Sequence, residues 1–232
     1  MACPAGLAWL DVGCGTGAFT QLIARRLAPK FIAGTDPAPA QIEFARRHLP
    51  QAEFKIAAAD SLPFAAAAFD VVASALVINF IPDRAKALAE MNRVLRPGGT
   101  VAAYLWDRDA HADHSPHAPM ERGLRDIGAE VLKPPATPES TPQGARAALD
   151  AAGFDNIVID TIEVTETFAG FDDYWQNQNL PLAPVAKAIA KLTEEQRGKL
   201  YDSMKAQLVP GPDGRISYAS RALAFKAGKP TK

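Results

Sequence analysis

Cysteine is scarce in this sequence, and neither sign of charge is in excess. Only Cys3 and Cys14 occur among 232 residues, so no disulfide framework is expected and a reducing cytoplasm is the expected location. The 25 Lys and Arg residues balance 26 Asp and Glu residues, whereas a dedicated nucleic-acid binder carries a strongly basic domain or stripe. The N-terminus also lacks the basic-then-apolar pattern of a signal peptide. We therefore expect no nucleic-acid partner.

Long hydrophobic runs are missing as well. The most apolar stretch, residues 64–81, approaches the length of a membrane span but contains Asp70, Ser74 and Asn79. A central carboxylate costs about 2.5 kcal/mol or more in lipid, so we expect a buried strand here and no membrane span. With 48% hydrophobic residues the chain can bury a sizeable core, and its length fits a single domain over residues 1–232.

Short apolar runs alternate with helix-period segments over the first half of the chain. Strands are expected over residues 7–12, 31–35, 53–57, 69–75 and 100–105. Helices are expected over residues 18–27, 38–49 and 83–95, the last ended by Pro97-Gly98-Gly99. This alternation implies parallel crossovers and a doubly wound α/β sheet.

The second half is less regular. Helices are expected over residues 118–132, 142–152 and much of 172–208, and strands over residues 156–168 and 216–225. Ligands of open α/β sheets bind outside the carboxyl ends of the strands. We therefore expect residues 1–105 to be the cofactor-binding half, and residues 106–142 and 168–214 to be helical inserts that form a substrate lid.

The most informative segment, Leu10-Asp-Val-Gly-Cys-Gly-Thr-Gly-Ala-Phe19, joins the first strand to the first helix. Gly13, Gly15 and Gly17 let the backbone turn sharply and approach a ligand, and a helix N-terminus favours a negative group. With Ala18 the segment also satisfies the dinucleotide pattern G-x-G-x-x-G/A. The glycines alone leave open a tight turn with no ligand.

Two carboxylates that follow strands point to a nucleoside. Asp36 lies 19 residues beyond Gly17, where an acid can accept both hydroxyls of a ribose; a helix cap is the alternative. Asp60 follows the third strand, where it can receive an exocyclic adenine amine; an ordinary turn residue is the alternative.

Asp11 discriminates between possible nucleosides. It lies two positions before Gly13 in an otherwise apolar strand, and a buried carboxylate without a partner is costly, so it should face a cation or hydrogen-bond donors. Asp11 would repel a pyrophosphate and attract an ammonium or sulfonium group. Ribose, adenine and a cationic centre without phosphate together describe S-adenosylmethionine.

These residues resemble those of the class I S-adenosylmethionine-dependent methyltransferases, particularly the group with ubiquinone/menaquinone C-methyltransferases and type 11 methyltransferase domains. The matching segments, in the family's order and spacing, are Leu10-Asp-Val-Gly-Cys-Gly-Thr-Gly17, Gly34-Thr-Asp-Pro37, Ala59-Asp-Ser-Leu-Pro-Phe64, Phe69-Asp-Val-Val72 and Arg93-Val-Leu-Arg-Pro-Gly-Gly99. They cover roughly residues 7–105. The resemblance implies a Rossmann-like seven-stranded sheet of order 3-2-1-4-5-7-6, with residues 216–225 as an antiparallel strand 7.

The resemblance also implies S-adenosylmethionine as cofactor and a role for each matching position. The methionine portion would be held by Asp11 and the turn residues Gly13, Cys14, Gly15, Thr16 and Gly17. The ribose would be held by Asp36, and the adenine by Asp60, Ser61 and Leu62. Pro37 and Gln41 would line the adenosine site, and the backbone near Ala75 would pass close to the methionine end.

The start of the chain departs from the family's pattern. Members usually carry a helix before the first strand that folds over the cofactor, whereas about six residues precede that strand here. This departure predicts a less enclosed cofactor, and a truncated or misassigned start is one explanation for it.

Candidate contacts to a substrate are Asn79, Phe80, Trp106, Tyr174 and Trp175. Packing between helix and sheet is an equally good role for the aromatic residues, and a bond to neighbouring backbone is the alternative for Asn79.

Histidines recur at intervals of three as His111, His114 and His117, among Asp107, Asp109 and Asp113. Imidazole and carboxylate suit several divalent ions, but Pro116 interrupts the helix that would place them on one face. We therefore expect a solvated loop and no metal site. A general base, if drawn from this group, would be His111 or His114.

The expected activity is that of a methyltransferase, EC 2.1.1.-, that moves a methyl group to carbon, oxygen or nitrogen of a small acceptor by in-line displacement. No residue is assigned as catalytic. Two alternatives remain: a non-catalytic S-adenosylmethionine-binding protein, and an NAD-dependent oxidoreductase, against which the acids at Asp11 and Asp60 count. The sequence leaves open the acceptor and whether the chain is a monomer or a homodimer.

Overall fold

The computed structural model of the chain describes residues 4–107, 114–131, 137–179 and 185–231. They divide into two compact units. Unit 1 draws on residues 1–105, 136–161 and 223–232, and unit 2 on residues 106–135 and 162–222.

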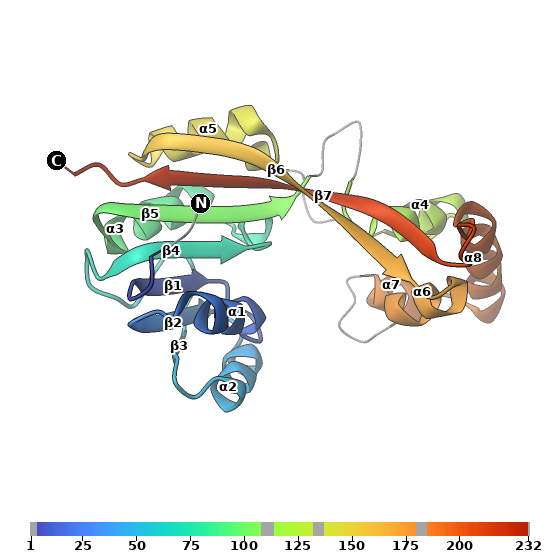
Figure 1. Cartoon of the computed structure of the whole chain (residues 1–232). Helices are drawn as coiled ribbons and strands as arrows, with labels where there is room; N and C mark the ends of the chain where they lie inside the picture. The colour runs from blue at the N-terminus through green and yellow to red at the C-terminus, as the bar shows by residue number, and fades with distance from the viewer. Residues whose placement is uncertain (1–3, 108–113, 132–136, 180–184, 232) are drawn as a thin grey trace. The chain divides into compact units, whose positions relative to one another are not determined.

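Seven strands form one sheet of order β3-β2-β1-β4-β5-β7-β6 (Figure 1). Their bounds are β1 Ala8–Val12, β2 Phe31–Asp36, β3 Glu53–Ile56, β4 Phe69–Ala75, β5 Leu95–Trp106, β6 Asp155–Phe168 and β7 Ile216–Gly228. The pairs β1–β2, β1–β4, β2–β3 and β4–β5 are parallel, and the arrow of β7 points against that of β5. The expected fold class, strand order and antiparallel strand 7 are confirmed.

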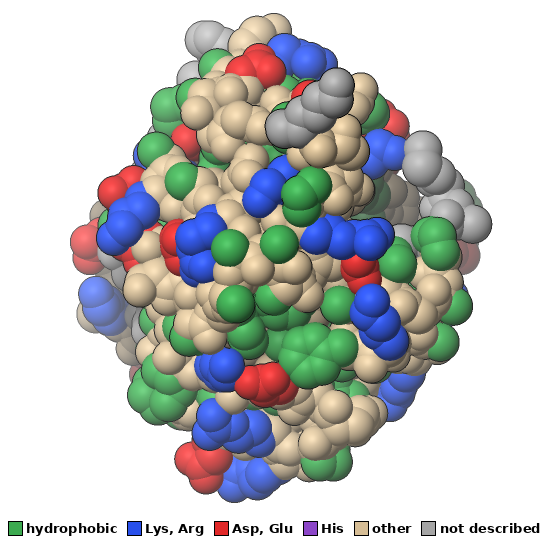
Figure 2. Space-filling view, turned by 90° about the vertical axis from the view of Figure 1, so that its left-hand side faces the viewer, with side chains coloured by type: hydrophobic (Ala, Val, Ile, Leu, Met, Phe, Trp, Pro, Cys, Tyr) green, Lys and Arg blue, Asp and Glu red, His purple; other side chains and the backbone are tan. Residues whose placement is uncertain are grey.

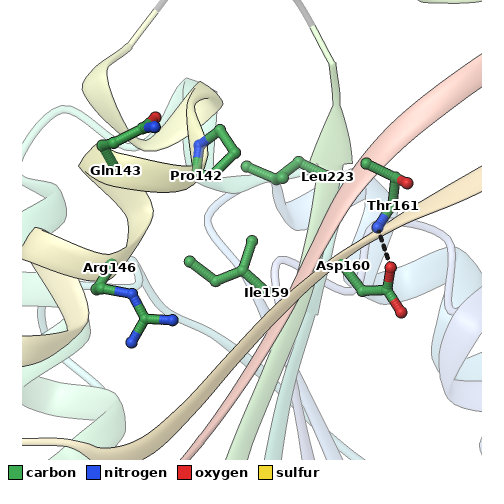
Figure 3. Close-up of a pocket in the computed structure, with 7 residues that line it drawn as sticks. All are labelled: Pro142, Gln143, Arg146, Ile159, Asp160, Thr161 and Leu223. Atoms are coloured by element: carbon green, nitrogen blue, oxygen red, sulfur yellow. Dashed lines mark hydrogen bonds between the residues drawn. The ribbon is translucent and has the colours of Figure 1, made fainter.

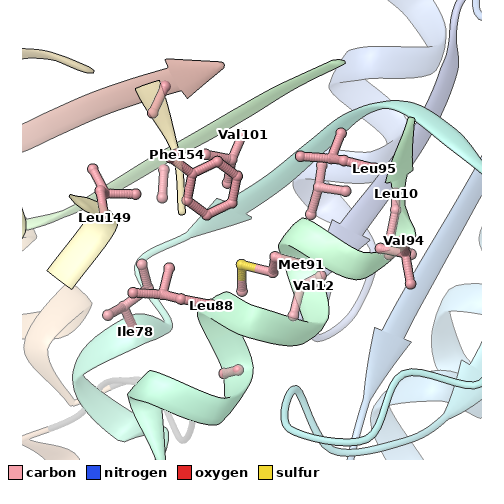
Figure 4. Packing of buried hydrophobic residues seen from close by; sticks show 14 of the residues in the cluster. Leu10, Val12, Ile78, Leu88, Met91, Val94, Leu95, Val101, Leu149 and Phe154 are labelled. Carbon is pink, nitrogen blue, oxygen red and sulfur yellow. The ribbon is translucent and has the colours of Figure 1, made fainter. Parts of the chain in front are cut away.

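Helices cover both faces of the sheet in unit 1. On one face lie α1 (Ala18–Leu27) and α2 (Pro39–His48), and on the other α3 (Arg84–Val94) and α5 (Pro142–Ala151). Successive side chains of a strand point to opposite faces. Leu10 and Val12 therefore join the core beneath α3, with Met91 and Leu149 (Figure 4). Asp11 points to the opposite face, which α1 covers.

The Pro-Gly-Gly segment has a different role from the one expected. The Asp83 carboxylate caps helix α3 by accepting a hydrogen bond from Lys86 N. The helix ends at Val94, and β5 begins with the next residue, Leu95. The prediction that the strand starts at Thr100 was therefore wrong. Residues 97–99 lie where the register with β4 shifts, and a Cβ on Gly99 would come within 3.0 Å of backbone oxygens, so glycine is needed there.

Unit 2 contains the last part of β6 and the first part of β7. The helices among its described residues are α4 (Ala118–Asp126), α6 (Phe171–Gln178), α7 (Ala186–Ala190) and α8 (Glu194–Gln207). The helix expected over residues 118–132 is thus shorter, and the helical stretch over residues 172–208 is divided into three helices. Gly123 allows α4 and α8 to approach closely, because a Cβ there would meet Met204 Sδ at 2.5 Å. Leu124, Tyr174 and Leu200 complete a core of this unit's own.

No helix in the described part of the chain is long and apolar enough to span a membrane. On the face shown in Figure 2, Lys and Arg side chains are spread among acidic and apolar ones and do not form a continuous stripe.

Candidate functional site

Asp11 is fully buried near the carboxyl end of β1. Its Oδ2 accepts a 2.6 Å hydrogen bond from Thr20 Oγ1 of α1, whereas Oδ1 has no hydrogen-bond partner among the described residues. Burial raises the pKa of Asp11 to about 6, and the hydrogen bond from Thr20 opposes this rise. A buried carboxylate oxygen without a donor is costly, so a ligand that brings a cation or an N–H group would stabilise it.

The glycines of the turn after β1 serve two different purposes. Gly13 has a φ of +76°, and a Cβ there would lie 2.4 Å from Val77 Cγ1, so packing as well as backbone conformation requires glycine. Gly15 has a φ of +53°, but the nearest atom to an added Cβ is Gln41 Oε1 at 3.9 Å. The turn therefore stays open above Gly15, where a ligand can approach the backbone.

The rest of the turn is tied to β2. The backbone N–H groups of Gly13 and Cys14 both donate to Thr35 O, at 2.7 and 2.9 Å. The Cys14 side chain is buried, and burial together with the carboxylate of Asp11 raises the pKa of its thiol well above the usual range. The thiol therefore stays protonated at neutral pH and is not a nucleophile. Thr16 is half-buried in the same turn, and Gly17 is the N-cap of α1.

Asp36 ends β2 and bridges two loops. Its Oδ2 accepts from Gly15 N at 3.0 Å and its Oδ1 from Ala38 N at 2.9 Å. Ala38, not Asp36, is the N-cap residue of α2. Each carboxylate oxygen can accept more than one bond, so Asp36 keeps capacity for hydroxyl donors. Next to it, Pro37 is exposed and Gln41 half-buried.

Asp60, Ser61 and Leu62 lie in the loop after β3. Asp60 is half-buried, with Lys86 Nζ 3.9 Å from its Oδ2, and Ser61 is exposed. Leu62 is buried, and its N–H donates to Glu90 Oε2 at 2.9 Å. Arg93 donates to the carbonyl of Leu62 at 3.0 Å and pairs with Glu90, so side chains of α3 hold this loop in place.

The end of β4 lies next to the turn. Ala75 is half-buried and pairs with Tyr104 of β5, whose carbonyl accepts from Leu76 N at 2.8 Å. The Tyr104 ring meets Phe19 of α1 edge-on at 5.9 Å, and burial and the charge of Asp11 raise the pKa of its phenol. Tyr104 therefore stays a neutral hydroxyl near the buried carboxylate.

The predicted substrate contacts fall into both units. In unit 1, Asn79 is buried with its Oδ1 accepting from Thr137 and Ser140, and Phe80 is 64% exposed. The hydrogen bonds that Asn79 Oδ1 accepts thus come from side chains 58 and 61 residues away. In unit 2, Trp106 and Trp175 are half-buried, and Trp175 stacks on Phe171 with the ring centroids 6.3 Å apart. Tyr174 is fully buried and belongs to the core of this unit. Their contact with a substrate stays a prediction.

The structure describes only part of the histidine-rich segment. His111, Asp109 and Asp113 lie outside the described residues, and His114 is held through its backbone by Asp107 and Arg221. Within the described ranges, no three His, Cys, Asp or Glu side chains come together as metal ligands.

A hollow of about 430 Å³ lies between α5 and β6 (Figure 3). Its lining residues are Pro142, Gln143, Arg146, Ile159, Asp160, Thr161 and Leu223. None of the predicted site residues is among these seven, and Asp160 already accepts from Thr161 N at 2.8 Å. We therefore place the candidate site at the carboxyl ends of β1–β4 and not in this hollow.

Sequence reasoning missed three residues that support this site. Thr20 orients Asp11, and its signal was a hydroxyl on the face of α1 that packs against β1. Glu90 and Arg93 hold the loop after β3; Arg93 lay in a recognised motif, but nothing in the pattern assigned it a role.

The chain is similar to known methyltransferases in sequence and in fold. A family model described as a methyltransferase domain matches residues 10–103. The chain is 37% identical over 106 residues to trans-aconitate 2-methyltransferase of Methylobacterium radiotolerans, a match that covers 45% of this chain and 40% of that protein. The chain spans less than half the length of this protein. It likewise covers 35% of malonyl-[acyl-carrier protein] O-methyltransferase of Serratia marcescens and 48% of phthiotriol/phenolphthiotriol dimycocerosates methyltransferase of Mycobacterium leprae.

Two solved structures share the fold across almost the whole chain. Phosphoethanolamine N-methyltransferase 2 of Haemonchus contortus, in complex with S-adenosyl-L-methionine, has a TM-score of 0.58 and 18% identity, covering 98% of this chain and 50% of that one. The [4+2]-cyclase SpnF has a TM-score of 0.61 and 21% identity, covering 99% and 77%. Residues 10–103 of this chain thus match a methyltransferase domain, and the chain has the fold of the class I S-adenosylmethionine-dependent methyltransferases, the family whose cofactor is S-adenosylmethionine.

Proposed function

We propose that the chain binds S-adenosylmethionine at the carboxyl ends of β1–β4 and transfers its methyl group to a small-molecule acceptor. The observation that carries this proposal is the Oδ1 atom of Asp11, a fully buried carboxylate oxygen with no donor among the described residues. A positively charged ligand compensates its desolvation, whereas a phosphate there would be repelled.

The other residues fit the same ligand. The open space above Gly15 admits the ligand close to the backbone, and Asp36 has capacity left for the hydroxyls of a ribose. The loop of Asp60, Ser61 and Leu62, held by α3, supplies the acid and backbone groups for an adenine ring. Together with Asp11, these features lie at the carboxyl ends of their strands, and parallel pairing brings those ends to one edge of the sheet.

The protein's part in the reaction is alignment and exclusion of water. When bound, S-adenosylmethionine supplies a methyl group on a sulfonium, which is already a good leaving group for in-line displacement. Asp11 holds the cationic part of the ligand, Thr20 keeps the Asp11 carboxylate oriented, and the apolar strand around it keeps water away. No residue is assigned as a general base, because the acceptor atom is not specified.

Ligand binding and turnover test this proposal in two steps. S-adenosylhomocysteine keeps the ammonium group and the nucleoside, so it should raise the melting temperature of the protein, whereas NAD should not. Transfer of radiolabelled methyl groups across a panel of small acceptors then tests catalysis. Absence of any binding of S-adenosylmethionine or S-adenosylhomocysteine by calorimetry would contradict the proposal.

A non-catalytic or differently catalytic role is the second candidate, because one protein of this fold is named a [4+2]-cyclase. Binding of S-adenosylhomocysteine without label transfer to any acceptor of a broad panel would favour it. An NAD-dependent oxidoreductase is disfavoured by the charge of Asp11.

A further inference from the structure

Unit 2 contains a hollow of about 390 Å³ that the proposed cofactor site does not use. It lies between the end of β6, the last turns of α6 and the start of α4. Its lining residues are His117, Glu166, Thr167, Phe168, Asn177 and Gln178.

Two buried polar groups of α6, one on a residue that lines this hollow and one a helical turn before it, lack a hydrogen-bond partner among the described residues. Gln178 is 6% exposed and lines the hollow, and its Oε1 accepts no bond. Tyr174, one helical turn earlier, is fully buried and its hydroxyl is likewise unpaired. Buried polar groups are normally satisfied, so an unpaired side-chain oxygen on a residue that lines a hollow points to a ligand that donates.

One donor serves two acceptors at Glu166, which lines the same hollow as Gln178. The Tyr218 hydroxyl lies 2.8 Å from both Glu166 Oε2 and Pro116 O, but its single proton can serve only one of them at a time. The Glu166 carboxylate and the Gln178 carbonyl therefore both have capacity for a further donor.

The charge and the aromatic side chain in the lining of the hollow favour a cation. Glu166 is acidic, and neither Lys nor Arg is among the six lining residues. Arg122 is close enough to act on the Tyr174 phenol but does not line the hollow. Phe168 provides an aromatic wall, with Tyr174 edge-on at 5.3 Å and Tyr218 stacked at 6.1 Å. Carboxylate, amide oxygen and aromatic ring together suit an organic ammonium group.

We propose that this hollow binds the ammonium group of a small amine. The proposal concerns unit 2 alone and does not rest on the proposed function.

Three probes of equal ring size test this proposal on the full chain. Calorimetry near neutral pH with benzylammonium chloride, benzyl alcohol and sodium benzoate, each with and without S-adenosylhomocysteine, compares a cation, a neutral donor and an anion. Benzylammonium should bind at least about tenfold more tightly than benzyl alcohol, and benzoate most weakly. Equal affinity for the three probes, or no binding of benzylammonium at millimolar concentration, would overturn the proposal.

Matched variants locate the site. Glu166→Gln keeps an acceptor for Tyr218 but removes the charge, so the preference for benzylammonium should fall to less than about threefold. Glu163→Gln, an exposed acid on the same strand, should leave it unchanged. Gln178→Leu should also weaken benzylammonium binding, without lowering the melting temperature, because it removes an unpaired buried group. An unchanged preference in Glu166→Gln would refute the assignment of the site.

S-adenosylhomocysteine binding on the same samples keeps the two proposals apart. Loss of the amine preference with S-adenosylhomocysteine binding intact rejects only the amine site. Intact amine preference without S-adenosylhomocysteine binding rejects only the proposed function.

Discussion

Replacing Asp11 by Asn should stabilise the fold while weakening ligand binding. The pKa of this carboxyl rises from an ordinary value of 3.8 to about 6 in the folded chain, so the folded state holds the proton more tightly than the unfolded state. The stability due to the proton is fully present below about pH 4 and is lost as the pH rises through 6. Above about pH 7 the ionised carboxylate costs about 3 kcal/mol.

Asparagine removes this charge and keeps an oxygen for the Thr20 hydroxyl. Its amide N–H₂ group is buried without a known acceptor, which costs about 1–2 kcal/mol, so the net gain at neutral pH should be about 1–2 kcal/mol. Affinity for S-adenosylhomocysteine should fall about 10- to 100-fold, because a charge pair at about 4 Å is worth up to about 4 kcal/mol at an effective dielectric of 20.

Urea unfolding followed by circular dichroism, at several values between about pH 5 and pH 8, measures the first effect. The difference in free energy of unfolding between Asp11→Asn and wild type should grow as the pH rises and level off above about pH 7. Using the difference cancels the contribution of other carboxyls, such as Asp70, whose pKa is lowered. Asp150→Asn, an exposed acid on α5, is the control and should change little.

Calorimetric titration with S-adenosylhomocysteine measures the second effect. A variant that is less stable than wild type at pH 7.5 and binds S-adenosylhomocysteine equally well would refute both the burial argument and the assigned ligand.

Three further outcomes are expected. Affinity for S-adenosylhomocysteine in wild type should drop as the pH falls through about 6, where Asp11 becomes protonated, and Asp11→Asn should lose this dependence; calorimetry at two pH values on either side of 6 checks it. Gly13→Ala should lower the free energy of unfolding by about 2 kcal/mol or more, because its Cβ would clash with Val77. Gly15→Ala should lower the free energy of unfolding by only about 1 kcal/mol but weaken S-adenosylhomocysteine binding, and unfolding and binding curves separate the two variants. Arg93→Leu should weaken S-adenosylhomocysteine binding several-fold and speed amide hydrogen exchange in the loop after β3, and unchanged exchange there would show that this anchor is dispensable.

The doubly wound sheet could be predicted from local pattern, because alternating strands and helices dictate parallel crossovers. The family and the strand order came from a resemblance, which depends on a glycine turn and on acids that follow successive strands at recognisable spacing. Asp11 was singled out because one carboxylate in an apolar strand must find compensation wherever the strand lies. The register shift at Pro97–Gly99 was not predicted, since it depends on how β4 and β5 pair.

The roles of individual side chains depended on tertiary structure. Packing of α1 on β1 brings Thr20 to one oxygen of Asp11 and leaves the other without a donor. Asn79 reaches Thr137, 58 residues away, a contact that no local pattern encodes.

By itself, the sequence determined the doubly wound sheet, the glycine turn and the buried acid beside it, because each follows from neighbours a few residues apart. Only the tertiary structure decided which polar atoms remain unpaired and which hollows they line. A hydrogen bond between distant segments is made or left open by packing, and packing is a property of the folded chain.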